Sequence, residues 1–309
     1  MNFSLVIPNL NGEKYLAESI PSFLQSLHDK FEIILIDNNS QDNSINLAKK
    51  IFPKIIVIKN NSNLGFAKAV NQGILKAKYD YVALLNNDLT LDKNWFDNIT
   101  KDIEKNPKAV AFSGTVLDKV GDSYESVGLR YFNYGKCQNI LNKKKFNPQK
   151  HSLFKNTNIW GASAAAIIYH RPTLIKVGLF DETFFAYEED VDLALRLHNL
   201  NYVTRFVPKS ISYHLGGGTS RRMGNFRHIM DAKNWIYIII KNYPLSLIFK
   251  NFFPIIIERM RNFSGLIKNT SMTQIPISIY RAYFPIVSNF PQMITKRHQI
   301  AKLLHDYRH

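Results

Sequence analysis

Residues 32–40 read Glu-Ile-Ile-Leu-Ile-Asp-Asn-Asn-Ser, an aliphatic run that ends in polar side chains. A short continuous apolar run followed by turn residues is typical of a strand that is buried on both faces. The same pattern recurs at residues 3–7, 55–58 and 81–85, where apolar runs also lead into loops rich in Asn, Asp or Gly. We therefore predict a mainly parallel sheet whose strands end in polar loops.

Helical patterns separate these strands. Apolar residues from Tyr15 to Leu27 recur at helical spacing, and residues 44–52, 66–78 and 91–105 also favour helices. Strands that alternate with helices indicate βαβ units and a Rossmann-like α/β fold. In such open sheets, ligands bind outside the carboxyl ends of the strands, so the loops that follow them are where we expect the functional residues.

The second half of the chain is less regular. Residues 118–158 are rich in Lys and Asn and predict an irregular excursion with a short hairpin. We then expect a strand at 160–169, a short helix after Pro172, a helix at 189–200 and a strand at 202–207. Beyond Gly218, helix-like segments separated by prolines take over. This change predicts an α/β domain at 1–218 and a mostly helical extension at 219–309.

Composition limits the class of protein. The 309 residues are 45% hydrophobic and 21% charged, which excludes a disordered, collagen-like or disulfide-rich chain. Cys137 is the single cysteine, so no intramolecular disulfide is possible, and this suits a reducing compartment. The first residues lack the pattern of a secretory signal, and Lys and Pro interrupt the apolar run at 235–257. We expect a cytoplasmic protein.

Basic residues gather in the helical extension. The net charge is +16, of which residues 219–309 contribute +11 through 14 Lys or Arg and three acids. Such a segment attracts anionic surfaces. Its aromatic residues suit an interfacial helix at the cytoplasmic face of the plasma membrane, or packing on the α/β domain, or a homo-oligomer contact; their density argues against a nucleic-acid partner. These residues are Trp235, Tyr237, Phe249, Phe252 and Phe253.

Two strand ends carry acids with more than one interpretation. Asp37 precedes Asn38 and Asn39, and its carboxylate suits the N3–H of a uracil or thymine base, or else caps the next helix. Asp88 ends the segment Asn86-Asn87-Asp88, which suits either a divalent cation beside a diphosphate or a simple turn.

Two later segments are also rich in reactive groups. Residues 184–196 read Phe-Phe-Ala-Tyr-Glu-Glu-Asp-Val-Asp-Leu-Ala-Leu-Arg. Such acids are partly explained by the helix dipole, which favours carboxylates in a first turn, but their crowding also raises their pKa values and suits a general base. Arg196 is explained as a surface partner of Asp192, one helical turn away. His214 precedes three glycines, Thr219, Ser220, Arg221 and Arg222, a loop that suits phosphate or is merely flexible.

Taken together, these segments resemble the inverting glycosyltransferases of family 2 with the GT-A fold, particularly the rhamnosyltransferase-like branch. The resemblance covers about the first 220 residues and depends on the joint occurrence of the segments in family order. The matching residues are Val6 to Asn9 with Asn11; Glu32 to Ser40 with Asp42 and Ser44; Asn63 to Ala67 with Asn71 and Gly73; Leu85 to Asp88; Trp160 to Ala162; Gly178 to Asp192 with Arg196; and His214 with the glycines after it.

The resemblance implies a role for each matching residue. Asp190, with Glu189 beside it, would match the catalytic base, and Asp88 and His214 would match the residues at a divalent cation, Mg²⁺ or Mn²⁺. The nucleotide sugar would be bound by Pro8, Asn9, Asn11, Asp37, Asn38, Asn63, Gly65, Phe66, Asn87, Trp160, Gly161 and Arg221. Asn86 stands where stricter relatives carry the first Asp of the metal motif, which puts strict metal dependence in doubt.

The implied activity is transfer of a sugar, with inversion, from a nucleotide-diphosphate donor to a saccharide or lipid-linked saccharide in cell-surface polysaccharide biosynthesis. The resembled branch suggests a dTDP-activated deoxysugar such as rhamnose. Two other functions stay open, a sugar-nucleotide-binding module without transferase activity and a nucleotidyltransferase. The latter lacks its Gly-rich basic signature here, where Pro8-Asn9-Leu10-Asn11 stands instead.

Overall fold

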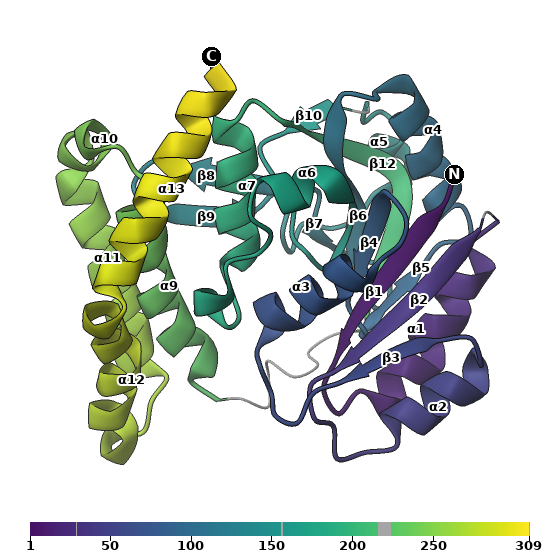
Figure 1. Ribbon diagram of the computed structural model, residues 1–309, viewed down its shortest axis with the longest axis horizontal. Coiled ribbons are helices and arrows are strands. Elements are labelled where there is room, and N and C mark those ends of the chain that lie inside the picture. Colours follow the sequence, from purple (N-terminus) through teal and green to yellow (C-terminus); the bar gives the residue numbers. More distant parts are fainter. Residues whose placement is uncertain (29, 156, 216–223, 309) are drawn as a thin grey trace.

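A ten-stranded sheet organises the chain (Figure 1). The computed structural model describes residues 1–28, 30–155, 157–215 and 224–308. Strands run in the order β10-β12-β6-β11-β4-β1-β2-β3, with β5 beside β12 and β7 beside β6, while β8 and β9 form a separate hairpin. The strands are β1 (Phe3–Asn9), β2 (Phe31–Asp37), β3 (Ile56–Lys59), β4 (Tyr81–Leu85), β5 (Leu89–Leu91), β6 (Ala109–Asp118), β7 (Tyr124–Ser126), β8 (Leu129–Phe132), β9 (Lys136–Asn139), β10 (Thr157–Ile159), β11 (Ala166–His170) and β12 (Val203–His214).

Helices cover both faces of this sheet. Those of the first 215 residues are α1 (Glu13–Gln25), α2 (Ser44–Ile51), α3 (Phe66–Lys76), α4 (Trp95–Lys105), α5 (Pro148–His151), α6 (Arg171–Lys176), the 3-10 turn η1 (Glu182–Phe184) and α7 (Glu189–Asn199). Successive side chains of β1 point to opposite faces of the sheet. Leu5 and Ile7 pack with α1, α2 and α4 on one face, and Val6 packs with α3, α6 and α7 on the other. The predicted α/β fold with a central sheet between helices is confirmed.

The parallel order holds for one half of the sheet. Strands β4, β1, β2 and β3 pair in parallel, as the apolar runs predicted. Beyond β4 the sheet is mixed, because β11 is antiparallel to both of its neighbours and β12 is parallel to β6 but antiparallel to β5 and β10. The carboxyl ends of β1, β2, β4, β6 and β12 nevertheless lead to one edge, where the loops meet.

Several predicted boundaries were wrong. The helix expected at 91–105 begins at Trp95, because Leu89–Leu91 pairs with β12 as a strand. The strand expected at 160–169 is confined to Ala166–His170, whereas the one expected at 202–207 continues to His214. Strand β6 has no predicted counterpart. Residues 118–158 do contain the expected hairpin, formed by β8 and β9.

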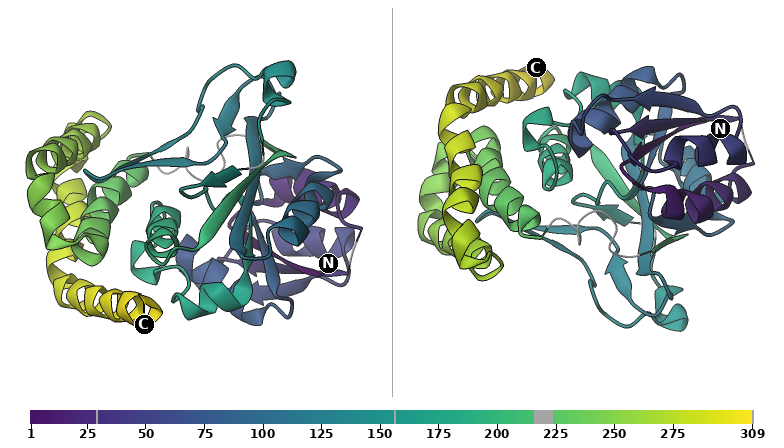
Figure 2. Two further views of the ribbon diagram at one scale, coloured as in Figure 1. Left: turned by 90° about the horizontal axis from the view of Figure 1, so that it is seen from above. Right: turned by 90° about the horizontal axis from the view of Figure 1, so that it is seen from below.

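The C-terminal extension is helical, as predicted, and lies at the end of the molecule farthest from β1–β3 (Figure 2). It contains α9 (Phe226–Asn242), α10 (Leu245–Lys250), α11 (Phe252–Lys268), the turn η2 (Met272–Gln274), α12 (Ile275–Ser288) and α13 (Phe290–Arg308). Helix α9 packs on α7 through a core that includes Trp235 and Tyr237, so these two aromatics are not surface groups. Among the described helices, none is both long and apolar enough to cross a bilayer.

Candidate active site

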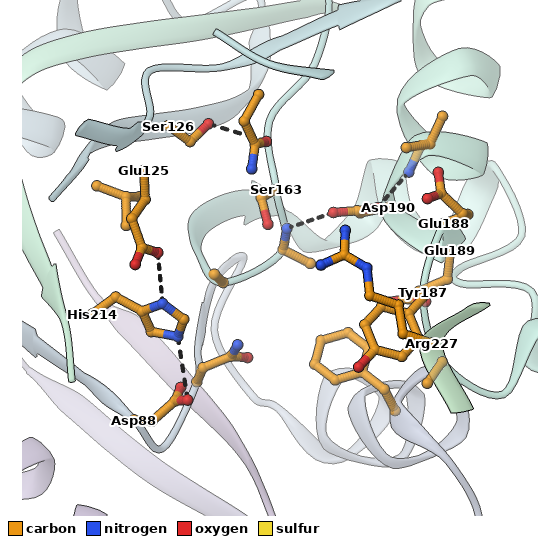
Figure 3. Close-up of a pocket in the computed structure, with 18 of the residues that line it drawn as sticks. Asp88, Glu125, Ser126, Ser163, Tyr187, Glu188, Glu189, Asp190, His214 and Arg227 are labelled. Carbon is orange, nitrogen blue, oxygen red and sulfur yellow. Dashed lines mark hydrogen bonds and ion pairs between the residues drawn. The ribbon is translucent and has the colours of Figure 1, made fainter. Parts of the chain in front are cut away.

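A cavity of about 1120 Å³ lies at the carboxyl edge of the sheet (Figure 3). Its lining comes from segments that are far apart in the chain: the ends of β1, β4 and β12, strand β7, and the loop before α7. Residues from all four predicted loops reach it, namely Asn38, Asp88, Asp190 and His214. The volume suits a ligand larger than a typical drug-sized molecule.

Seven of the residues predicted to bind a nucleotide sugar line this cavity. They are Pro8, Asn9, Asn38, Asn63, Gly65, Phe66 and Asn87. Their amides are ordered by hydrogen bonds: Asn87 Nδ2 donates to Asn9 Oδ1 at 2.7 Å, and Asn9 Nδ2 donates to Asp37 Oδ1 at 3.0 Å. These bonds hold the two amides in place beside the cavity.

Asp37 itself does not line the cavity. Its side chain is fully buried, and its second oxygen accepts a hydrogen bond from the backbone N–H of Ser40 at 3.0 Å. The carboxylate therefore orients Asn9 and the following turn. A direct contact between Asp37 and a base stays a prediction.

Three other predicted residues also lie outside the lining, and a fourth cannot be placed. Asn11 is exposed and accepts a hydrogen bond from the backbone of Gln41. The Trp160 ring stacks on Tyr131 with centroids 4.5 Å apart, and Gly161 lies so close to Ala194 that a side chain there would clash. Arg221 lies outside the described residues.

Gly65 lies where the residues predicted to bind the nucleotide sugar meet the loop before α7. Its φ of +85° is in the left-handed region, and an added Cβ would lie 2.5 Å from the carbonyl oxygen of Phe185. The same carbonyl accepts a hydrogen bond from the N–H of Phe66 at 2.6 Å, at the start of α3. Glycine is therefore needed at this position for both its backbone conformation and its small size.

Asp88, His214 and Glu125 form a connected group on one side of the cavity (Figure 3). His214 Nε2 lies 3.2 Å from Asp88 Oδ2, and His214 Nδ1 lies 2.6 Å from Glu125 Oε2. Burial acts to lower the pKa of His214, but the bonds to Asp88 and Glu125 outweigh it and raise this pKa to about 10. Glu125 thus fixes the orientation of the imidazole ring.

The donor atoms of Asp88 and His214 suit a divalent cation. In the structure the 3.2 Å contact is a hydrogen bond from the protonated Nε2 to Asp88, so a cation held by both groups would take the place of this proton. Glu125 would then orient the histidine through its Nδ1–H. Among the described residues, no three His, Cys, Asp or Glu side chains are arranged to hold a metal by themselves. Water or ligand phosphates would have to complete the shell, as is common for Mg²⁺.

The loop before α7 has an unusual backbone. Phe185, Tyr187 and Glu188 have φ angles of 66°, 67° and 65°, a region that residues other than glycine rarely adopt. Strain of this kind persists only where surrounding contacts impose it. It turns Glu188, Glu189 and Asp190 together toward one end of the cavity (Figure 3).

These carboxyl groups are more basic than usual. Burial, followed by the charge of Asp190, raises the pKa of Glu189 to about 8, so this group is protonated at neutral pH. Burial also raises the pKa of Asp190, against hydrogen bonds from the N–H groups of Ala164 and Val191 that lower it. Asp190 is therefore held in position and is a stronger base than an exposed aspartate.

Helix α9 supplies the contacts that impose this backbone. Asn234 Nδ2 donates to the carbonyl oxygens of Phe184, Ala186 and Tyr187 at 3.2, 2.9 and 2.7 Å. Lys241, almost completely buried, lies 2.6 Å from Asp181 Oδ2 and 2.7 Å from Asp192 Oδ1. Contacts from the C-terminal extension thus stabilise the loop before α7.

Sequence reasoning missed some of these residues. Glu125, Asn234 and Lys241 act across long sequence separations, and no local pattern marks them; Arg227, which lines the cavity, was counted only for its charge. The explanation of Arg196 as a surface partner was wrong. Its guanidinium is buried and donates to the carbonyls of Val177 and Leu179 as well as to Asp192, because α7 lies between the sheet and α9.

Comparison with known proteins identifies the domain. The family model for glycosyl transferase family 2 matches residues 4–178. Poly-beta-1,6-N-acetyl-D-glucosamine synthase of Staphylococcus aureus is 25% identical over 207 residues, 66% of this chain and 48% of the relative. Glycosyltransferase GlyG of Streptococcus pneumoniae is 26% identical over 201 residues, 63% of each protein. The chain spans about half the length of the first of these curated relatives.

Solved structures share the fold. TarS 1-349 of S. aureus, in complex with UDP-GlcNAc, superposes with a TM-score of 0.58 at 17% identity, covering 100% of this chain and 90% of that one. The mannosyltransferase PcManGT of Pyrobaculum calidifontis, in complex with GDP-Man and Mn²⁺, gives 0.55 at 12% identity, covering 99% and 86%. These similarities extend over the helical C-terminal region as well as the sheet.

Proposed function

The chain belongs to glycosyl transferase family 2, and from that premise we propose that it transfers a sugar from a nucleoside-diphosphate donor to a hydroxyl group of a saccharide or lipid-linked saccharide. We further propose that transfer inverts the anomeric configuration and serves cell-surface polysaccharide synthesis. The similarity to poly-beta-1,6-N-acetyl-D-glucosamine synthase supports this assignment.

One observation carries the proposal. A basic carboxylate, Asp190, and a carboxylate–imidazole pair, Asp88 and His214, line the same cavity as the ordered amides of Asn9 and Asn87. A transferase of this kind needs all three features, because it must bind a nucleotide, stabilise a departing diphosphate and accept a proton from the attacking hydroxyl.

Asp190 is the proposed general base. Its carboxylate accepts the proton of the acceptor hydroxyl, the acceptor oxygen forms a bond to the anomeric carbon, and the bond between that carbon and the diphosphate oxygen breaks. The nucleoside diphosphate leaves with the electron pair from the opposite face, which inverts the configuration. Ala164 and Val191 hold Asp190 through their N–H groups, so its free lone pairs stay directed into the cavity.

Asp88 and His214 would hold a divalent cation, Mg²⁺ or Mn²⁺, which neutralises charge on the diphosphate when bound. Glu125 accepts a hydrogen bond from Nδ1 of His214, and this leaves Nε2 directed at Asp88. Arg227 also lines the cavity and provides a permanent positive charge. The predicted contact from Arg221 stays part of the proposal.

The identity of the donor sugar is a separate proposal. The rhamnosyltransferase-like resemblance favours a dTDP-activated deoxysugar, and we propose dTDP-rhamnose as the first donor to test. UDP-GlcNAc is the second, because TarS was solved with it and because the relative's name specifies poly-N-acetylglucosamine. We place the enzyme at the cytoplasmic face of a membrane, where a lipid-linked acceptor would be reached.

A donor screen tests the proposal. The purified full chain is incubated with dTDP-rhamnose, UDP-GlcNAc and GDP-mannose, each with Mg²⁺, Mn²⁺ or EDTA, and release of the nucleoside diphosphate is measured with and without saccharide acceptors. We expect one donor to be turned over, with faster release when an acceptor is present. Binding of a donor without turnover under any of these conditions would indicate the binding module instead.

A further inference from the structure

Exposed apolar side chains are concentrated on the C-terminal helices. Within the described residues, 14 of the 19 exposed large hydrophobic side chains lie between positions 245 and 290. Of the other five, all in the α/β part, only Leu153 and Phe154 are adjacent in the sequence. Scattered apolar residues are normal on protein surfaces, whereas a contiguous concentration marks an interaction surface.

One stripe of these residues runs along α11. Phe253, Ile256, Met260 and Phe263 follow one another at spacings of three and four residues, so they share one face of that helix, and Phe249 is exposed on the preceding helix α10. The opposite face of α11 is the one that packs inward. The exposed stripe therefore has no partner within the described chain.

A second stripe lies on α12. Ile277, Tyr280, Phe284 and Val287 again recur at spacings of three and four residues and are all exposed, while Ala282 is fully buried on the inner face. Helices α11 and α12 contact each other and both contact α9. Figure 2 shows that both helices lie at the end of the molecule away from β1–β3, and we call α10, α11 and α12 the outer layer.

The charges around these stripes are of one sign. Lys250, Arg261, Lys268 and Arg281 are exposed on the same helices. The single acid between residues 232 and 305 is Glu258, which is buried against Lys136 and Arg261. A second copy of this face would bring positive charge against positive charge, whereas an anionic lipid surface complements it.

We infer that α10, α11 and α12 form a docking surface for the anionic lipid headgroups of a bilayer, with the two apolar stripes inserted at the headgroup boundary. An amphipathic helix with basic residues beside its apolar face binds in this way without spanning the bilayer. This extends the sequence-based hypothesis and corrects its residues, because Phe249, Phe252 and Phe253 are exposed whereas Trp235 and Tyr237 are core residues.

The same helices are connected to the active-site loop through α9. Helix α9 lies between the outer layer and the catalytic loop, and its Asn234 and Lys241 hold that loop. Docking at the outer layer would orient the cavity relative to the membrane, a consequence that rests on the proposed function. The lipid contact itself does not depend on the chemistry, so the two are tested separately.

Vesicle co-sedimentation of the full chain tests the inference. Phe249 and Phe253, 77% and 76% exposed, are both changed to Ser; the matched control changes Val120 and Leu153, 78% and 77% exposed, to Ser. On vesicles of phosphatidylcholine with phosphatidylglycerol, we expect the first double variant to bind at least about tenfold more weakly than the wild type. The control should bind like the wild type.

A charge variant and a size measurement complete the test. Lys250→Glu, Lys268→Glu and Arg281→Glu combined, or vesicles of phosphatidylcholine alone, should also weaken binding by about tenfold or more. Equal binding by wild type and the phenylalanine variant overturns the inference. So does a dimer in size-exclusion chromatography that the phenylalanine variant dissociates, because a second copy would then cover the stripes. Donor turnover in solution should be unchanged in every variant.

Discussion

Asn234 on helix α9 donates a hydrogen bond to the carbonyl oxygen of Tyr187, 2.7 Å away, and so connects the C-terminal extension to the residue two positions before the Glu189–Asp190 pair. The same amide reaches two further carbonyls of that loop. Tyr187 has a φ of 67°, and Phe185 and Glu188 on the same loop also have positive φ angles. The extension thus supports the loop that leads to the Glu189–Asp190 pair.

Asn234→Ala removes these three hydrogen bonds from a buried position. We expect the loop to relax, with a loss of about 1–3 kcal/mol in the free energy of unfolding and a larger fall in kcat than in donor affinity. Urea unfolding and steady-state kinetics check this. The matched control, Asn269→Ala on the exposed end of α11, should change neither. An unchanged kcat for Asn234→Ala would show that the loop holds its shape without α9.

Lys241→Met tests the buried ion pairs behind the loop. Removing the ammonium takes away the buried cation that Asp181 and Asp192 share, while Lys296 still pairs with Asp181 and Arg196 still pairs with Asp192. Leaving a buried charge with no partner costs about 3–5 kcal/mol, and because each carboxylate keeps one partner we expect a loss of about 2–3 kcal/mol. Urea unfolding should show this loss, and Lys250→Met, at an exposed position, should show almost none. A loss below about 1 kcal/mol for Lys241→Met would contradict the geometry.

His214→Ala tests the proposed cation site. We expect nucleoside diphosphate to lose its Mn²⁺-dependent stabilisation of the fold, and Glu125→Gln to weaken Mn²⁺ affinity by about tenfold through poorer orientation of the imidazole. Thermal unfolding with nucleotide, with and without Mn²⁺, gives the measurement. His28→Ala, on the exposed surface, is the control. Full Mn²⁺ dependence in His214→Ala would exclude this histidine as a ligand.

Glu189 predicts a pH dependence of stability. Burial and the charge of Asp190 raise its folded pKa from 4.5 to about 8, so the folded state binds more protons than the unfolded state between these values. Its ionisation therefore costs stability as the pH rises through that window. Thermal unfolding from pH 5 to 8.5 should show a steeper decline for the wild type than for Glu189→Gln. The exposed control, Glu18→Gln, should follow the wild type; parallel curves for all three would refute the shift.

The sequence predicted the parts that local patterns determine. Apolar runs such as Phe31–Asp37 ended in polar loops, and because parallel strands share an edge, the segments with Asn38 and Asp88 were expected to lie at one edge, whereas Asp190 was added by the family resemblance. The features that the sequence did not predict depend on pairing between segments that are far apart in the chain. Strand β6 lies against β12 so closely that a Cβ at Gly114 would lie 1.9 Å from the carbonyl oxygen of Ser210, and nothing near either residue signals this.

Residue roles were hardest to infer where burial decides them. Asp37 is predicted to bind a base because it ends a strand, and only the fold reveals that its neighbours enclose it and that it orients Asn9. Asn234 is one of several polar residues in α9, and only the fold reveals the carbonyls 47 to 50 positions away that it binds. Local sequence identifies strand ends, whereas packing determines which side chains face the cavity.

Asp190→Asn measures the central claim most directly. The substitution keeps the shape and removes the proton acceptor, so turnover should fall by about 10² to 10⁴-fold, while stabilisation of the fold by nucleoside diphosphate with Mn²⁺ stays near the wild-type value. Glu18→Gln provides the baseline for an unrelated acid. Turnover within about twofold of wild type, with the donor still bound, would contradict the role of Asp190 as the base.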